Sequence, residues 1–401
     1  MPIHPPPTTL RHAGLLLQDL RATFVSLKLT LVLLGFSMVL VFAATLDQVN
    51  LGIWAVQEKY FRTFVVYGQV GPAVLPLFPG GYTVGGLLML NLAAAFVGRF
   101  TLTWRHAGLL LAHAGLILLL VGELLTGLWQ EDYHLRLDQG ETRNYAESFR
   151  EHELVVIDAS ETKSDHVITI PVSWLERQAA VQHPQLPFRV VPKGYHPNAV
   201  LHRRAADAGP AVATAGVGQR IQVTPRPVTH RPKEQNVPAA FVELVAAGQS
   251  LGTFLVSPQL EAPQDFTHEG RPWRIALRLR RLYQPFSLTL LQFSHDRYAG
   301  TEIPKNFASR LRLNTPDGRG DREVLIYMNN PLRHGGLTFY QSGFANNDRT
   351  TILQVVRNPS WLLPYLACGL MSVGLLAQFG YHLAGFVGRR RRPAVSPPVS
   401  A

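Results

Sequence analysis

Four long apolar stretches divide the chain, at residues 29–46, 82–98, 107–129 and 361–388. A helix needs about 17 to 25 mainly apolar residues to cross a bilayer, so each stretch predicts a transmembrane helix. The first stretch lies close to the N-terminus, where a cleaved signal peptide would also lie. Its length, and the three further spans behind it, favour a retained helix.

Between the third and fourth stretches, residues 129–360 change to a two-residue period. Apolar residues alternate with arginine in "RIALRLRRL" from Arg274, and alternation recurs in "SRLRL" at residues 309–313. This period is typical of half-buried strands. The segment "TPDGRGD" at residues 315–321 marks a turn between two such runs. We therefore predict a large, mainly antiparallel β domain, a sandwich or an open barrel, with a loop at residues 205–218.

The loop between the first two spans contains "NLGIWAVQEKYFRTFVVYG". Because its aromatic and apolar residues lie beside a span, we predict a helix that lies at the membrane interface. The predicted parts of the chain are a cytoplasmic tail at 1–28, three transmembrane helices within 29–128 with an outer interfacial segment at 47–80, an extracytoplasmic β-rich domain at 129–360, a fourth transmembrane helix at 361–388 and a basic tail at 389–401.

The formal net charge of +11 lies mostly before the first span, between the second and third, and after the fourth. These segments hold nine Lys and Arg residues against one acid, Asp19. Basic residues concentrate on the cytoplasmic side of membrane proteins. We therefore expect both termini to be cytoplasmic and residues 129–360 to be extracytoplasmic, which is periplasmic in a Gram-negative cell. Since topology accounts for the charge, we expect a lipid bilayer and no nucleic acid as partner.

HExxH and the phosphate-binding loop do not occur in the sequence, and its one GxSxG match, "GQSLG" at residues 248–252, lies in the segment "VAAGQSLGTFLV", which predicts a hairpin. The ten histidines of residues 129–360 are scattered singly, and their spacing selects no metal ligand or haem contact among them. The sequence has a single cysteine, Cys368, which lies in an apolar stretch. Because there is only one, a disulfide framework within the chain and a Cys-rich zinc site are excluded. We predict no catalytic residue and no metal site.

One histidine is unusual because it lies inside a predicted span. His113 is eight residues past Arg105, which places it about 12 Å along the helix axis. An ionisable side chain at that depth is a functional hypothesis. Gly108, Gly115 and Gly122 recur every seven residues and form a flat stripe that another helix or a planar ligand can approach. A neutral imidazole is a good axial haem ligand. The alternative is a neutral histidine bonded to a neighbouring helix.

A dense polar and aromatic stretch, "MNNPLRHGGLTFYQSGF" at residues 328–344, comes shortly before the last span. Asn and Pro favour a sharp turn, and the two glycines permit a close backbone approach. One hypothesis is a hairpin that fixes the outer domain on its last helix. The other is a surface that touches a partner protein or haem. The residues singled out in this motif are Asn329, Pro331, Gly336, Tyr340 and Gln341.

Three segments together resemble the ResB family, also called Ccs1 or CcsB, of system II cytochrome c biogenesis. They are "FSLTLLQFSHDRYAGTEIPKNFASRLRL" from Phe286, "EVLIYMNNPLRHGGLTFYQSGF" from Glu323 and "VVRNPSWLLPYLACGLMSVGLL" from Val355. The order of three spans, a large outer domain and a final span with a basic tail also resembles that family.

The resemblance implies a subunit, itself non-catalytic, of a cytochrome c synthase (haem lyase) complex in the bacterial inner membrane. It implies a partner of the ResC or CcsA type with a tryptophan-rich segment; here the six tryptophans are dispersed. It also implies that haem b is moved outward and presented to apocytochrome c, and that His113 matches the haem-linked histidine of the third span. The residues alone leave an alternative of another class: a membrane-anchored extracytoplasmic binding or scaffold protein of the cell envelope without haem chemistry.

Overall fold

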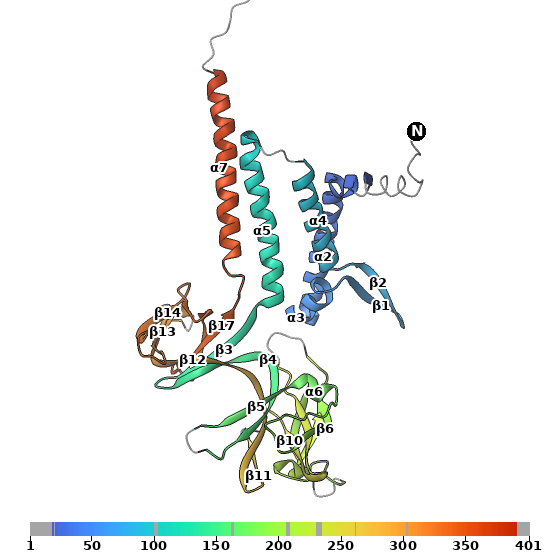
Figure 1. The fold of residues 1–401 in the computed structure, drawn as a ribbon, viewed down its shortest axis with the longest axis vertical. Helices are drawn as coiled ribbons and strands as arrows, with labels where there is room; N and C mark the ends of the chain where they lie inside the picture. Colours follow the sequence, from blue (N-terminus) through green and yellow to red (C-terminus); the bar gives the residue numbers. More distant parts are fainter. Residues whose placement is uncertain are drawn as a thin grey trace, which may run out of the picture. The chain divides into compact units, whose positions relative to one another are not determined.

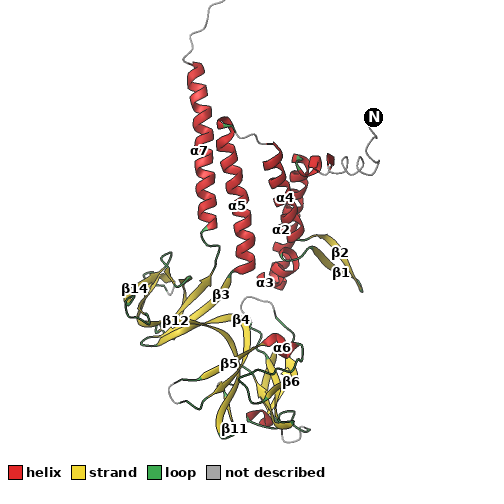
Figure 2. Cartoon of the chain, in the orientation of Figure 1, coloured by secondary structure: helices red, strands yellow, loops and turns green. Residues whose placement is uncertain are grey.

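The computed structural model describes residues 18–19, 21–99, 103–161, 164–205, 209–229, 235–260, 262–301 and 304–390. The chain divides into two units. The first, here called the membrane unit, consists of Met1–Gln130 and Asn358–Ala401; the second, here called the β unit, consists of Glu131–Arg357. The long helices belong to the membrane unit, and the large sheets belong to the β unit (Figures 1 and 2).

Four helices of the described residues are long and apolar enough to cross a membrane. They are α2 (Leu27–Leu51), α4 (Gly81–Arg99), α5 (Ala107–Trp129) and α7 (Leu363–Arg390). A single turn of 3₁₀-helix, η2 (Trp104–His106), leads directly into α5. The four predicted spans are confirmed, and the chain is a multi-pass membrane protein.

Close backbone contact joins α5 to α7. A Cβ atom added to Gly108 would lie 2.6 Å from the carbonyl oxygen of Gly374, and one added to Gly374 would lie 2.6 Å from the amide nitrogen of Ala112. A Cβ atom on Gly115 would lie 2.8 Å from the carbonyl oxygen of Ala367. Lipid supplies little hydrophobic drive for helix association, so van der Waals contact between small residues has to hold such pairs together.

A buried amide joins α2 to α4. Asn91 is 2% exposed; its Nδ2 donates to the carbonyl oxygens of Phe24 at 2.6 Å and Ser26 at 3.2 Å. Its Oδ1 accepts from the hydroxyl of Thr30 at 2.6 Å. Buried polar groups need partners, and here the partners are the residues at the start of α2, so the pair is held in one register.

The segment between α2 and α4 differs from its prediction. After a short helix, α3 (Ile53–Val56), and one π-helical turn, η1 (Gln57–Phe61), it forms a hairpin of β1 (Val65–Val70) and β2 (Ala73–Pro79). The predicted helix is therefore wrong beyond Phe61. The reason is local: β-branched Val residues favour strands, and Gly71 turns the chain with a φ of 63°.

Ten strands of the described residues form one antiparallel sheet in the β unit. The order is β14-β13-β12-β4-β3-β17-β16-β15, with β11 on β12 and β5 on β4. The strands are β3 (Glu131–Asp138), β4 (Thr142–Asp158), β5 (His166–Pro171), β11 (Gln264–His268), β12 (Arg271–Arg297), β13 (Pro304–Asn314), β14 (Arg322–Tyr327), β15 (Leu332–His334), β16 (Leu337–Ala345) and β17 (Thr350–Arg357). The 17 residues of β4 and the 27 residues of β12 are long enough to serve two cores.

One end of the sheet curls into a nearly closed barrel, here called the barrel lobe. Its core is formed by alternate residues of β3, β12, β13, β16 and β17, with Leu137, Leu288, Leu311, Phe339 and Leu353 fully buried. A bridge between Tyr327 and Asn330 brings the chain from β14 toward β15. The alternation seen in the sequence therefore marks the inward and outward faces of this barrel.

The other end of the sheet forms half of a sandwich, here called the sandwich lobe. It faces a three-stranded sheet of β6 (Arg189–His196), β9 (Ala239–Ala246) and β10 (Gln249–Val256), with a shared core that includes Trp273. The remaining elements are α6 (Val172–Glu176), β7 (Ala199–Arg203), η3 (Val217–Arg220) and β8 (Ile221–Pro225). The predicted fold class is confirmed, and the two alternatives, sandwich and open barrel, both occur. Residues 209–216 form no regular element, as expected of the predicted loop.

Candidate functional site

His113 lies half-buried on α5 and is fixed by its own helix. Its Nδ1 is 2.9 Å from the carbonyl oxygen of Leu109, one turn earlier. A carbonyl oxygen can only accept a hydrogen bond, so Nδ1 carries the proton and donates. In a neutral imidazole, Nε2 then holds the lone pair, which is the tautomer that an axial ligand requires. His113 could therefore bind haem iron through Nε2.

The glycine stripe lies on another face of the helix. Gly108, Gly115 and Gly122 are the buried residues of α5 and pack against α7. His113 is five residues past Gly108 and two before Gly115. At 100° per residue, it lies about 140° around the helix from Gly108 and about 160° from Gly115. Of the two roles predicted for the stripe, the structure supports helix packing. Any ligand of His113 would therefore lie on a different side of α5 from the α7 contact.

Two further histidines among the described residues of the membrane unit have polar partners nearby. The Nδ1 of His106, seven residues before His113, is 3.0 Å from the hydroxyl of Thr103. On α7, the Nε2 amide of Gln378 donates to Nε2 of His382 at 2.9 Å. Both histidines lie near helix ends, so the free-energy cost of placing an ionisable side chain in the bilayer is smaller for them than for His113.

The motif at residues 328–344 forms two consecutive turns of the barrel lobe. Asn329 has a φ of 63°, between Tyr327 and Asn330, whose backbone groups pair. Gly335 and Gly336, with φ of 59° and 75°, form the two-residue turn between β15 and β16. A Cβ atom added to Gly335 would lie 2.8 Å from the ring of Phe286. The predicted close approach is thus made by Gly335, while Gly336 serves the turn.

Tyr340 and Gln341 point to opposite sides of β16. Tyr340 is 38% exposed. Gln341 accepts from the hydroxyl of Ser309 at 2.6 Å and donates to the hydroxyl of Thr351 at 3.0 Å. Ser309 and Thr351 are fully buried. Pro331 is half-buried at the entry to β15. Gln341 therefore belongs to a polar network that links β13, β16 and β17 inside the barrel lobe.

A histidine–aspartate pair was missed by the sequence analysis. The side chain of His295 is 2% exposed, and its Nδ1 lies 2.9 Å from Oδ1 of Asp348. Arg297 donates to the other carboxylate oxygen at 3.1 Å. The ring of Phe344 lies 4.3 Å from the His295 ring, and Nε2 has no hydrogen-bond partner among the described residues.

The turn that carries Asp348 has an uncommon backbone. Asn346, Asn347 and Asp348 all have positive φ, at 51°, 51° and 65°. Asn and Asp adopt this conformation more readily than other non-glycine residues. The "NND" sequence could have marked the turn, but its partner His295 is 53 positions away, beyond the reach of any local pattern.

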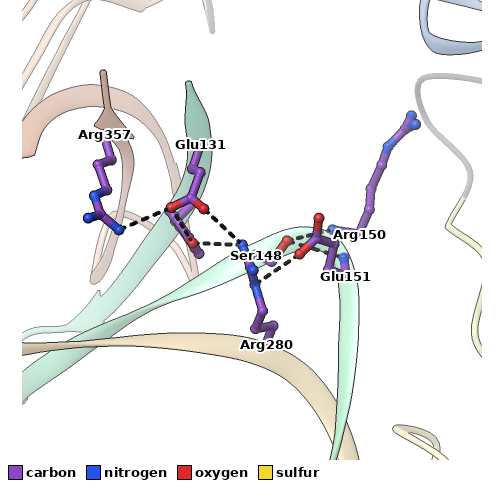
Figure 3. A network of polar contacts seen from close by, with 7 residues as sticks. Glu131, Ser148, Arg150, Glu151, Arg280 and Arg357 are labelled. Atoms are coloured by element: carbon purple, nitrogen blue, oxygen red, sulfur yellow. Dashed lines mark hydrogen bonds and ion pairs between the residues drawn. The ribbon is translucent and has the colours of Figure 1, made fainter. Parts of the chain in front are cut away.

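Charged residues gather where the β unit begins and ends, here called the Arg280 cluster (Figure 3). Arg280 on β12 lies 3.8 Å from Glu131 and 2.9 Å from Glu151. It also donates to the hydroxyl of Tyr133 at 2.8 Å, and that hydroxyl donates to Glu131 at 3.0 Å. Burial raises the pKa of Tyr133 to about 12. The tyrosine therefore stays neutral and can donate.

At the edge of this cluster, β4 bends. The hydroxyl of Ser148 accepts from the amides of Arg150 at 3.4 Å and Glu151 at 3.1 Å. The side chain of Arg150 points away from the other labelled residues (Figure 3), and burial lowers its pKa. These contacts fix the bend at which β4 passes from one lobe to the other.

No group of three or more His, Cys, Asp or Glu side chains is placed to hold a metal ion within the described ranges. The expectation of no metal site concerned the whole chain and stays a prediction. His230, Ile303 and the last basic residues lie outside the described residues.

Comparison with known proteins adds three findings. The model of the ResB-like family matches residues 244–352. Protein NrfI of Wolinella succinogenes is 36% identical over 92 residues, which are 23% of this chain and 10% of that protein. The match thus spans about a tenth of the length of that curated relative. A solved structure, the cytochrome c haem lyase CcmF, covers 75% of this chain and 31% of its own at 11% identity and a TM-score of 0.20. That likeness is too slight to carry an argument.

Proposed function

From the match of residues 244–352 to the ResB-like family and the similarity to protein NrfI, we propose that the chain is a ResB-like, non-catalytic subunit of a complex that matures c-type cytochromes. In this proposal the subunit assists the transfer of haem b across the membrane and its presentation to apocytochrome c. The family match covers most of the barrel lobe, including the 328–344 motif and the Asp348 turn.

The observation that carries the haem proposal is the hydrogen bond from His113 to the carbonyl oxygen of Leu109. It fixes the ring orientation and the tautomer of a histidine inside a membrane span, as a second partner does for metal-bound histidines. Haem iron accepts a neutral imidazole as an axial ligand. His113 would hold the iron from one side, and the second ligand would come from the partner.

The proposed partner is a membrane protein of the ResC or CcsA type. The support is compositional: the six tryptophans of this chain are dispersed, and in this proposal the partner supplies the tryptophan-rich segment that such complexes are expected to have. We place the complex in the bacterial inner membrane. The distribution of Lys and Arg supports cytoplasmic termini and a β unit on the periplasmic or extracytoplasmic side.

The test is His113→Ala in the full chain, co-expressed with its ResC-type partner. The substitution removes the imidazole but little apolar packing, so the protein should still insert. Haem recovered with the complex should fall, and added imidazole should restore part of it. His106→Ala is the matched control, since that side chain lies at the helix end and pairs with Thr103.

The opposite outcome is also informative. If the His113→Ala protein accumulates normally and retains the full haem content and cytochrome c maturation, His113 is a structural residue. The envelope scaffold without haem chemistry would then account better for the chain.

A further inference from the structure

The β1–β2 hairpin exposes apolar side chains outside the long helices of the membrane unit. Tyr67, Val74, Leu75 and Leu77 of the hairpin are 54%, 67%, 46% and 53% exposed, and Phe64, just before β1, is 69% exposed. Successive residues of a strand point to opposite faces. Since the neighbours Val74 and Leu75 are both exposed, both faces of the hairpin are open at these residues.

Charge is absent from this whole region. From Thr63 to Gly98 the sequence contains no Asp, Glu, Lys or Arg. The charged residues just before it are already paired: Lys59 lies 2.6 Å from Asp47, and Arg62 lies 2.9 Å from Glu58. A surface without charge has little to offer a charged partner, whereas it suits a lipid environment.

The hairpin is anchored at the end of a membrane helix. One residue, Gly80, separates the end of β2 from the start of α4. The amide of Gly80 donates to the carbonyl oxygen of Phe64 at 2.9 Å, and the Thr83 hydroxyl donates to the same oxygen at 2.6 Å. On the other strand, Val66 is fully buried in a small core with α2 residues such as Leu40. The hairpin therefore leaves the membrane unit beside α2 and α4 (Figure 1).

Two physical limits define where such a hairpin can lie. A two-stranded sheet with exposed apolar side chains is marginal in water. The hydrocarbon core is also excluded, because both outer edges of the sheet carry unpaired backbone groups that need water or headgroups. The membrane–water interface satisfies both limits, and aromatic residues such as Tyr67 and Tyr82 are enriched there.

We propose that the β1–β2 hairpin is a lipid-binding element that lies in the membrane–water interface at the N-terminal end of α4. Its apolar side chains insert among the headgroups and upper acyl chains, and its strand edges stay hydrated. Because it carries no charge, its insertion does not depend on anionic lipid. This inference rests on the transmembrane helices and is independent of the haem proposal.

The experiment uses the full chain in nanodiscs that hold one copy each, with Cys368→Ala as background. This removes the single cysteine, which is exposed on α7. Bimane is attached at Val74→Cys and, separately, at Leu77→Cys, so that a local defect at one position does not decide the result. Quenching is measured with aqueous iodide and with lipid carrying a spin label near the headgroup, in phosphatidylcholine with and without phosphatidylglycerol.

Two further labelled sites calibrate the quenching by lipid and by water-borne iodide. Met38→Cys on α2, 70% exposed, reports a lipid-facing helix, and Val212→Cys in the β unit, 58% exposed, reports water. We expect strong lipid quenching at both hairpin sites and iodide quenching about threefold weaker than at residue 212, in either lipid mixture. Iodide quenching equal to that at residue 212 would overturn the proposal. So would protection from both quenchers, which would mean that protein covers the hairpin.

Discussion

Glu131 and Arg357 are register partners on adjacent antiparallel strands, although 226 positions separate them in the chain. Glu131 is the first residue of β3 and follows α5 by two positions, whereas Arg357 is the last residue of β17, shortly before α7. Their side chains form an ion pair at 3.5 Å. The chain therefore enters and leaves the β unit through neighbouring strands, and Arg280 lies beside this pair.

Arg280→Ala should destabilise the β unit, because it leaves Glu131 and Glu151 without the cation they share. Arg280 is 39% exposed, so solvent screening limits the loss to about 1 kcal/mol. Arg312→Ala is the control: its pair with Glu323 lies 3.4 Å apart, with both side chains 53% exposed. Denaturant unfolding in detergent measures both. Equal effects of the two substitutions would mean that the Arg280 cluster has no special role in stability.

Gly335→Ala should lower the free energy of unfolding more than Gly336→Ala does. Both glycines have positive φ, and alanine there costs about 1–2 kcal/mol each. Only at residue 335 does the new methyl also meet a ring, that of Phe286 at 2.8 Å, and crowding of this kind adds about 1–3 kcal/mol. Thermal unfolding of the two variants compares them directly. A larger loss for Gly336→Ala would contradict the close approach of Gly335 to the ring.

Gly108→Ala should loosen the α5–α7 pair, because a methyl group would lie 2.6 Å from backbone atoms of Gly374 and Gln378. We expect a loss of about 1–3 kcal/mol, typical of overpacking. Gly127→Ala on the same helix meets nothing within 4 Å and should be neutral or slightly stabilising. The readout is the thermal midpoint in detergent. If Gly127→Ala proves the more damaging of the two, the glycine stripe is not the contact face.

Acidification should destabilise the β unit near neutral pH. Burial lowers the pKa of His134 and of His152 below their ordinary value of 6.5. Above 6.5 neither the folded nor the unfolded state is protonated at these sites, so stability is unaffected. As pH falls below 6.5 the unfolded state binds protons first, and stability declines until the folded pKa is passed. His152→Asn should flatten this part of the curve, and substitution of the exposed His166 serves as the control.

The four apolar spans and the fold class followed from the sequence because they depend on local composition. The span of α5 was predicted at 107–129 and runs from Ala107 to Trp129, since length and apolarity alone decide whether a helix can cross a bilayer. The alternation in "RIALRLRRL" likewise marked β12, because a strand that buries one face must alternate. His113 stood out for its depth in a span, which also needs no tertiary information.

The sequence by itself determined which segments enter the membrane, which form strands and which histidine is unusual. Only the tertiary structure decided which faces meet. It packed the glycine stripe of α5 against α7, with His113 on another face, and it formed the β1–β2 hairpin where the sequence predicted the end of a helix. It also joined His295 to Asp348 and Glu131 to Arg357. The physical reason is that composition and period act over a few residues. Contacts between distant segments depend instead on how all the faces pack at once, and no local pattern carries that information.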